Sequence, residues 1–220
     1  MYIDYFHIRF RRLRYEDIEL LRQWRNAEWM RPYMHDQRYI TKEMQKKWFR
    51  SIDNLNNWYF IIETDDGVLG SAALKHINFE TGEAEPGVMM GGVEDSAHIV
   101  SSAAMMFVSE VAFNLFGLSR LEAYLYESHK RALASNKKIG ANILKRFGSN
   151  SVYTELTPEN FEKNAVKLRK ALRQLTDRQE TLTIQLSGND PQTFAAFILK
   201  KLHQKNNPQA EKFRLIDNRG

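Results

Sequence analysis

The sequence contains no cysteine. This absence excludes disulfide bonds, zinc sites built from thiolates and a cysteine nucleophile, and it is compatible with a reducing compartment. The six histidines, at positions 7, 35, 76, 98, 129 and 203, form no HxxxH or HxH pair. We therefore expect no metal centre.

A long apolar segment is also missing. No run approaches the roughly 18 apolar residues of a membrane span, and residues 1–4 lack the basic-then-apolar pattern of a secretory signal. With 220 residues, 43% of them hydrophobic, the chain is long enough to bury a core. We expect a globular, cytoplasmic protein with one large domain, or with one domain and an appendage.

The net charge of +5 is unevenly distributed. Residues 161–220 contain 12 Lys and Arg against 6 Asp and Glu, whereas residues 1–160 contain 20 against 21. Such an excess can bind nucleic acid or an anionic surface, but here the basic residues are scattered through helical patterns without a dense run. We interpret them as a solvated face and do not expect nucleic acid as a partner.

The first half of the sequence predicts a strand, two helices and three further strands. Apolar residues over 8–13 indicate a strand, and helical spacing over 18–24 and 44–55 indicates two helices, the second with Thr41 as its N-cap. Segments 58–63 and 68–77 predict a hairpin with Asp66-Gly67 in its turn, followed by a strand over 83–93. Pro86 removes a ladder hydrogen bond, so we expect a sheet edge or a bulge near it.

The second half predicts helices that alternate with strands. One helical face runs from Ala104 to Leu115 and ends at Gly117, before a strand over 120–127, a short helix over 129–140 and a hairpin of 142–147 with 151–156. Helices at about 158–175 and 191–204 flank a strand at 181–187. The residues from about Pro208 are predicted to form a loosely held tail.

Five segments between Ile8 and Ala141 follow one another in a distinctive order: IRFRRLRYEDIELLRQWRN, WYFIIETDDGVLGSAAL, AEPGVMM, AFNLFGLSRLEAYL and HKRALASNKKIGA. In this order they resemble the GNAT superfamily of acyl-CoA N-acyltransferases, particularly its ribosomal-protein, polyamine and nucleotide-linked amino-sugar acetyltransferases. The resemblance implies an α+β fold, an α/β/α sandwich with a mixed, largely antiparallel sheet flanked by helices over residues 1–157. Residues 158–220 would then be a C-terminal α/β extension packed on this domain or on a partner subunit, which leaves a homodimer open.

The resemblance also implies acetyl-CoA as the co-substrate. In the family, the pantetheine arm lies along the open edge of the central strand, and the pyrophosphate binds backbone N–H groups at the start of the next helix. The family's loop has two glycines that let the backbone approach the phosphates, and Ala97 and Ile99 stand at or near those positions here. The implied cofactor-binding residues are Met90, Gly91, Gly92, Val93, Ser96, Ala97, His98, Ile99, Val100, Ser101, Ser102 and Asn136. Alternatively, Ile99 and Val100 are core residues of a first helical turn.

Acetyl transfer to an amine places demands on the site. The amine must be neutral to attack a thioester, so a base or a water relay is needed, and the leaving thiolate benefits from a proton donor. The resemblance places Glu83 and Glu85 where family members often have a carboxylate, and His129 where they often have an Asn that contacts the cofactor arm. We predict Glu85, Glu83 and His129 as catalytic residues. Solvated strand-end charges and a helix cap are the alternatives, and Asn136 lies near where many members carry a thiolate-protonating Tyr.

Residues 24–52 are similar to the acetyltransferases that modify a nucleotide-linked amino sugar. The predicted acceptor-binding residues are Trp24, Arg25, Asn26, Arg31, Tyr33 and Gln37. Aromatic rings there would stack on a base or sugar, and Arg25 or Arg31 would pair with a phosphate. Alternatively, Trp24 belongs to the core and Arg25-Asn26 caps a helix. Tyr124 and Tyr126 share one strand face, which is either a ligand-binding surface or a second buried face.

The preferred function is therefore an acetyl-CoA-dependent N-acetyltransferase that acts on a small-molecule amine, with a nucleotide-linked amino sugar as the favoured acceptor. Two alternatives stay open. One is the same chemistry on a protein or peptide amine, such as a protein N-terminus, or on a polyamine. The other is a GNAT-like module that binds a ligand without catalysis.

Overall fold

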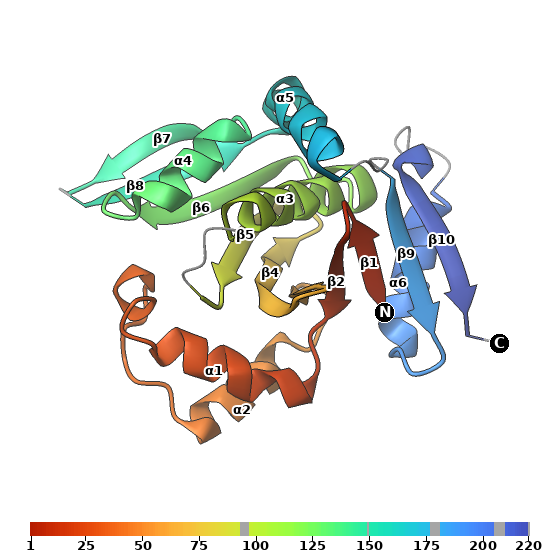
Figure 1. Ribbon diagram of the computed structural model, residues 1–220, viewed down its shortest axis with the longest axis horizontal. Helices are drawn as coiled ribbons and strands as arrows, with labels where there is room; N and C mark the ends of the chain where they lie inside the picture. Colours follow the sequence, from red (N-terminus) through yellow and green to blue (C-terminus); the bar gives the residue numbers. More distant parts are fainter. Residues whose placement is uncertain (93–96, 149, 177–180, 205–209, 220) are drawn as a thin grey trace.

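A computed structural model describes residues 1–92, 97–148, 150–176, 181–204 and 210–219, without the side chains of 97, 98, 175, 176 and 210. Within these residues ten strands form one sheet in the order β10-β9-β1-β2-β3-β4-β5-β6-β8-β7 (Figure 1). The strands are β1 Tyr2–Tyr5, β2 Ile8–Arg12, β3 Trp58–Thr64, β4 Gly67–Asn78, β5 Glu83–Met90, β6 Arg120–Tyr126, β7 Asn142–Phe147, β8 Ser151–Leu156, β9 Leu182–Ser187 and β10 Phe213–Asn218.

The helices lie between these strands in the sequence. They are α1 Ile18–Asn26, α2 Lys42–Ile52, α3 Ala97–Glu110, α4 Lys130–Lys138, α5 Pro158–Thr176 and α6 Gln192–Leu202, with short turns η1 Tyr15–Asp17, η2 Arg31–Tyr33, η3 Val111–Leu115 and η4 Ala210–Lys212. All strand pairs are antiparallel except β5 with β6 and β9 with β10. The predicted fold class, a mixed and largely antiparallel sheet flanked by helices, is confirmed.

The sheet buries apolar side chains on both faces, because β3 is apolar at successive positions. Phe60 packs against Phe107 of α3, with ring centroids 5.1 Å apart. Ile61, on the opposite face, joins a cluster with Leu13 and Leu21 that α1 and α2 cover. A sheet with helices on both faces is the α/β/α arrangement expected from the sequence.

Local signals in the sequence place several element ends correctly. The hydroxyl of Thr41 accepts a hydrogen bond from the backbone N–H of Met44 at 3.2 Å, which caps α2 as predicted. Gly67 in the β3–β4 turn and Gly117 after η3 have φ angles of +117° and +70°, values that glycine adopts without strain. Both the hairpin and the end of the helical segment are therefore confirmed.

Two strands differ from the sequence-based expectations. Residues 213–218 were expected in a loose tail, but they form β10, which pairs in parallel with β9, so that prediction is wrong. The strand is held because Phe213 is buried and Leu215 packs against the same core. β1 was not predicted at all, although Ile3 and Tyr5 alternate with half-buried residues, as a strand at the edge of a core does.

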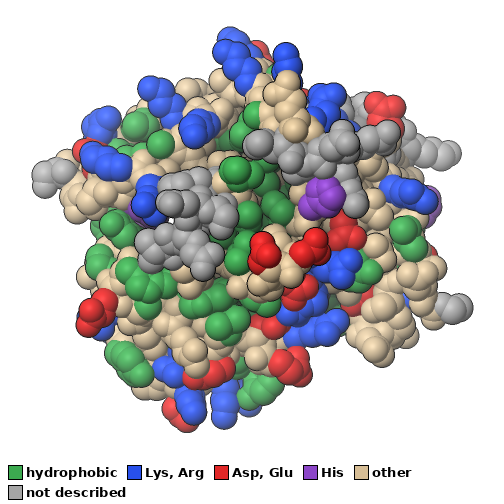
Figure 2. Space-filling view, in the orientation of Figure 1, with side chains coloured by type: hydrophobic (Ala, Val, Ile, Leu, Met, Phe, Trp, Pro, Cys, Tyr) green, Lys and Arg blue, Asp and Glu red, His purple; other side chains and the backbone are tan. Residues whose placement is uncertain are grey.

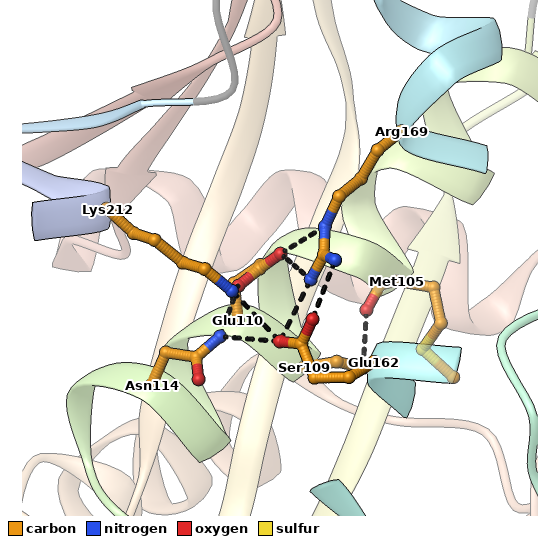
Figure 3. Close-up of polar contacts among 7 residues, drawn as sticks. All are labelled: Met105, Ser109, Glu110, Asn114, Glu162, Arg169 and Lys212. Carbon is orange, nitrogen blue, oxygen red and sulfur yellow. Dashed lines mark hydrogen bonds and ion pairs between the residues drawn. The ribbon is translucent and has the colours of Figure 1, made fainter. Parts of the chain in front are cut away.

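The C-terminal residues are tied to α3 by a partly buried charge network (Figure 3). The Arg169 guanidinium donates to Glu110 Oε1 from Nε at 3.0 Å and from Nη2 at 2.6 Å, and to Glu162 Oε2 from Nη1 at 2.8 Å. Lys212 Nζ donates to Glu162 Oε1 at 2.9 Å. Two carboxylates and two cations thus neutralise one another. Glu110 and Arg169 are buried and require this compensation, whereas Glu162 and Lys212 are 41% and 26% exposed. The division of the chain at residue 157 stays a prediction.

The basic excess of the last quarter lies partly on solvent-exposed helix surface. Lys163, Lys167, Lys170 and Arg173 of α5 are all exposed. Figure 2 shows that basic side chains predominate along the upper part of the molecule in this view, over α4 and α5. Within the described part of the chain, no helix is long and apolar enough to cross a membrane.

Candidate active site

The candidate site begins where β5 and β6 separate. These parallel strands pair only through Glu83 with Arg120 and Ala84 with Leu121. From Glu85 onward, β4 is the only described strand that pairs with β5, so among the described residues its other edge is open to an extended ligand. Pro86 lies in this open stretch, opposite Leu74, and the β4–β5 register shifts nearby, between Lys75 and Asn78. The edge and bulge expected near Pro86 are confirmed.

The start of α3 follows β5 in the chain, as a phosphate site requires. The helix begins at Ala97, and free backbone N–H groups at such a start favour an anion. Ile99 is 46% exposed, whereas Val100 is buried. The alternative interpretation, that both are core residues of the first helical turn, therefore holds for Val100 only. Ser101 and Ser102 are half-buried in the first turns. Val93 and Ser96 and the side chains of Ala97 and His98 lie outside the described residues.

The end of β5 is in contact with α1. Gly91 lies under the Trp24 indole so closely that a Cβ atom at Gly91 would be 2.2 Å from Cε2 of Trp24. Trp24 also packs against the apolar cluster beneath α1 and α2, so it has the core role proposed as the alternative and borders the site as well. Met90 packs against the core of the other face, whereas a Cβ at Gly92 would meet no atom of the described residues within 4 Å.

Arg25, in the last turn of α1, has a guanidinium group whose hydrogen-bonding capacity is not fully used. Its Nε is buried and has no hydrogen-bond partner among the described residues. Burial lowers the pKa of the guanidinium, against the opposing influence of Tyr59 and Asp36. Asn26 has a structural role, because its side chain donates to the carbonyl of Ile40 at 2.9 Å and accepts from the Ile40 N–H at 2.8 Å. These two bonds close the loop that carries the predicted acceptor residues Arg31, Tyr33 and Gln37.

This loop joins α1 to α2 in the chain and contacts β6 and the start of α4. The Tyr33 ring stacks on His129, with centroids 4.2 Å apart and planes at 18°. His35 Nε2 lies 3.1 Å from the carbonyl oxygen of Tyr124. Gln37 donates within the loop to the carbonyl of Pro32 at 3.3 Å. The sequence alone did not predict His35, and no spacing pattern pointed to it.

The two predicted catalytic carboxylates face the same side of the sheet as α1 and α2, and both are paired with cations. Glu85 Oε1 contacts Lys75 Nζ, and its Oε2 lies 3.2 Å from His76 Nδ1. Glu83 is paired with Arg120, whose Nε lies 2.9 Å from Glu122. The side chains of Glu83 and Glu85 are 28% and 30% exposed, so they border solvent without being fully solvated. Within the described residues, no group of His, Asp and Glu is arranged to hold a metal ion.

His129 directly precedes α4. Asn136, which lies near the position where many family members carry a tyrosine, is inside that helix. Burial lowers the pKa of His129, and the nearby Arg131 lowers it further. No side-chain hydrogen bond caps the helix at His129, so the capping alternative has no contact to support it. Asn136 is buried, and its Nδ2 donates to the carbonyl of Ala132 at 2.9 Å.

The open edge of β5, the start of α3 and the loop after α1 together fit the binding of a thioester cofactor opposite an acceptor. Residues 7–142 match the family described as Acetyltransferase (GNAT) domain. The chain belongs to this family. Its members transfer an acetyl group from acetyl-CoA, so the protein is an N-acetyltransferase with acetyl-CoA as co-substrate. The family, the enzyme class and the cofactor predicted from the sequence are confirmed.

Solved structures show the same fold at low identity. A domain from Methanocaldococcus jannaschii has a TM-score of 0.60 at 19% identity, covering 68% of this chain and 97% of that one. Spermidine N-acetyltransferase from Vibrio cholerae, in complex with CoA and spermine, has a TM-score of 0.60 at 12% identity, covering 71% and 98%. Campylobacter jejuni N-acetyltransferase PseH has a TM-score of 0.54 at 18% identity, covering 69% and 99%. Comparison with curated proteins gives no match.

Proposed function

We propose that the protein acetylates the amine of a nucleotide-linked amino sugar. The observation that carries this proposal is Arg25, whose buried Nε has no hydrogen-bond partner among the described residues and lies beside the acceptor loop. A buried donor that lacks an acceptor is costly, and a phosphate oxygen supplies the acceptor with a charge of the right sign. The resemblance of residues 24–52 to acetyltransferases of such sugars points to the same acceptor.

A polyamine acceptor fits less well. Polyamines carry several positive charges and require carboxylates that are not already neutralised. Glu83 and Glu85 lie on the acceptor side, but Arg120 and Lys75 are paired with them. The pairing leaves this part of the site close to neutral, which favours an acceptor with one amine and additional polar groups.

In the proposed reaction, the neutral amine attacks the thioester carbonyl, a new C–N bond forms, and the C–S bond breaks to release the CoA thiolate. The attacking nitrogen must lose a proton. Because burial lowers the pKa of His129, its imidazole is neutral near pH 7 and can accept that proton. Glu85 and Glu83 serve in this scheme as relay and orienting groups, with their partner cations holding them at the start of β5.

A thiol-release assay tests the acceptor. Purified protein with acetyl-CoA should release CoA thiol with nucleotide-linked amino sugars faster than with polyamines or peptides. Arg25→Met should raise the KM for the nucleotide-linked acceptor by roughly ten- to a hundred-fold, the range expected for a lost hydrogen bond to a charged group. The KM for acetyl-CoA should change less than a few-fold.

Arg50→Met is the matched control, because Arg50 is an exposed arginine on α2. It should leave both KM values unchanged. Thiol release with polyamines or peptides, and none with any nucleotide-linked sugar, would contradict the proposed acceptor. Equal effects of the two arginine substitutions would show that Arg25 has no role in binding it.

A further inference from the structure

Three aromatic side chains lie next to one another beside the site, two of them exposed and the third, Tyr153, half-buried. We call Tyr124, Tyr153 and Phe147 the aromatic platform. Tyr124 of β6 and Tyr153 of β8 are direct cross-strand neighbours, with ring centroids 4.8 Å apart. The ring of Phe147 of β7 lies 5.9 Å from that of Tyr124. Tyr124 is 53% exposed and Phe147 39%, so the second face of β6 is not a buried face at this position.

Isolated apolar side chains are common on protein surfaces, whereas adjacent exposed rings are not. The other face of β6 already supplies the core contacts, through buried Leu121 and Ala123. The exposed rings of Tyr124 and Phe147 therefore contribute little to the core, and their exposure suits contact with a ligand. Because every base has a flat π-face, a row of exposed rings is suited to stacking with a nucleobase.

The platform is continuous with the acceptor side. His35 of the loop after α1 lies 3.1 Å from the carbonyl oxygen of Tyr124, and its ring centroid is 5.4 Å from that of Tyr126. Burial and the nearby carboxylate of Glu122 raise the pKa of Tyr153 to about 12. Glu122 in turn lies 2.9 Å from the Nε of Arg120, the partner of Glu83. Contacts thus run from the start of β5 to the platform along one face of the sheet.

Charge and distance define what this surface can hold. Lys145 Nζ lies 4.9 Å from the Phe147 ring centroid, so a cation borders the rings and can pair with a phosphate. In the order β5-β6-β8-β7, two strands lie between the open edge of β5 and Phe147, and the paired strands β6, β8 and β7 are each about 4.8 Å apart. An extended acceptor with its amine at β5 and a ring at the platform must carry a polar linker between them, as a nucleotide-linked sugar does.

We propose that the aromatic platform stacks on the base of the acceptor and determines its specificity. This inference rests on the proposed function and adds the residues that recognise the nucleotide part. The phosphates lie between Arg25 and Lys145 in this arrangement, and the sugar amine lies at the open edge of β5. Tyr124 and Phe147 are specificity-determining residues, with no part in the transfer itself.

Titration calorimetry with free nucleoside diphosphates tests the platform directly. Uridine, cytidine, thymidine, adenosine and guanosine diphosphates should each be titrated into protein saturated with CoA, so that the cofactor's own ADP part does not compete. Inorganic pyrophosphate is the control without a base. At least one diphosphate should bind more tightly than pyrophosphate, and Tyr124→Ala and Phe147→Ala should each weaken it by roughly ten- to a hundred-fold, as expected for a lost stacking partner.

Two further variants separate stacking from general damage. Tyr124→Phe retains the ring and should bind the diphosphate within a few-fold of the unmodified protein. Tyr15→Ala removes a tyrosine that is 50% exposed outside the platform and should change nothing. CoA affinity, measured on every variant, should stay the same. Equal affinities for diphosphates and pyrophosphate, or unchanged binding in both platform alanine variants, would overturn the proposal.

Failure of the platform and failure of the proposed function give different results. If the unmodified protein acetylates nucleotide-linked sugars while the alanine variants keep the same KM, the function stands and the platform proposal is wrong. If only amines without a base are acetylated, the proposed function is wrong. The diphosphate titration then decides about the platform alone.

Discussion

The indole of Trp24 lies directly against Gly91, where a Cβ atom would come within 2.2 Å of Cε2 and 2.7 Å of Nε1. This contact joins α1, which carries predicted acceptor residues, to the end of β5, which carries predicted cofactor residues. It also sets a boundary of the site, because no side chain larger than hydrogen fits between the ring and the strand. The relative placement of the two halves of the site therefore depends on a glycine.

Gly91→Ala should destabilise the protein and impair acetyl transfer. The new methyl group must displace a tryptophan ring, and overpacking of this kind costs about 1–3 kcal/mol. Urea unfolding measures the loss, and the thiol-release assay measures the activity. Gly92→Ala is the matched control, since a Cβ there meets none of the described atoms within 4 Å. Equal stability of the two variants would show that Trp24 moves aside without cost.

Arg169→Ala should lower the free energy of unfolding strongly. The substitution leaves Glu110, which is 2% exposed, as a buried carboxylate without its main partner. Breaking a buried pair from one side costs about 3–5 kcal/mol. Lys170→Ala, at an exposed position of the same helix, should cost little. A loss below about 1 kcal/mol for Arg169→Ala would mean that water or Lys212 replaces the guanidinium.

The same network predicts an acid-sensitive contribution to stability. Burial acts to raise the pKa of Glu162, but hydrogen bonds from Arg169 and Lys212 lower it to about 2. A carboxylate with a depressed folded-state pKa stabilises the protein above its unfolded pKa of about 4.3 and loses that contribution as the pH falls. Unfolding free energies measured from pH 6 to pH 2 should therefore decline less steeply in Glu162→Gln. Parallel curves would contradict this role.

Local sequence signals predicted the elements of this fold better than their pairing partners. Thr41, Gly67 and Gly117 mark element ends because each satisfies a backbone requirement within a few residues. β1 and β10 were missed because each is stabilised by its partner strands. β1 pairs with β2 across a turn and with β9, which is far away in the sequence, and β10 pairs with β9. No local pattern contains that information.

The candidate site shows the same limit. The positions of Glu85, His129 and Tyr33 followed from resemblance, but their partners did not. The pairing of Glu85 with Lys75 and the stacking of Tyr33 on His129 arise only when the sheet register and the loop after α1 bring them together. The aromatic platform required the order of β6, β8 and β7, which places β8 between two strands that precede it in the chain.

Ser102→Asp should weaken acetyl-CoA binding. Ser102 lies in the second turn of α3, near the start where backbone N–H groups would meet the pyrophosphate, and a carboxylate there repels that anion. Calorimetry should show a higher Kd whose increase shrinks when salt is added, because salt screens exposed charges. Gln174→Glu adds the same charge at an exposed position of α5 and should have no effect. Unchanged affinity in Ser102→Asp would place the pyrophosphate elsewhere.

His129 should determine the acidic limb of the activity profile. Burial and the neighbouring Arg131 lower its pKa, so the imidazole stays neutral at pH 7 and becomes protonated only below its ordinary value of about 6.5. If it accepts the proton from the attacking amine, kcat should fall as the pH drops through that lowered pKa, and His129→Gln should remove this limb. General-base groups contribute roughly 100- to 10,000-fold to rate, so kcat should drop within that range while the Kd for CoA stays within a few-fold. Glu85→Gln and Glu83→Gln should reduce kcat without moving the limb, because their carboxylates orient groups and are not the titrating base.

A stacking role for His129 would look different. The Gln variant would keep the wild-type pH profile, and the loss would appear in the KM of the acceptor, since Tyr33 would lose the ring on which it stacks.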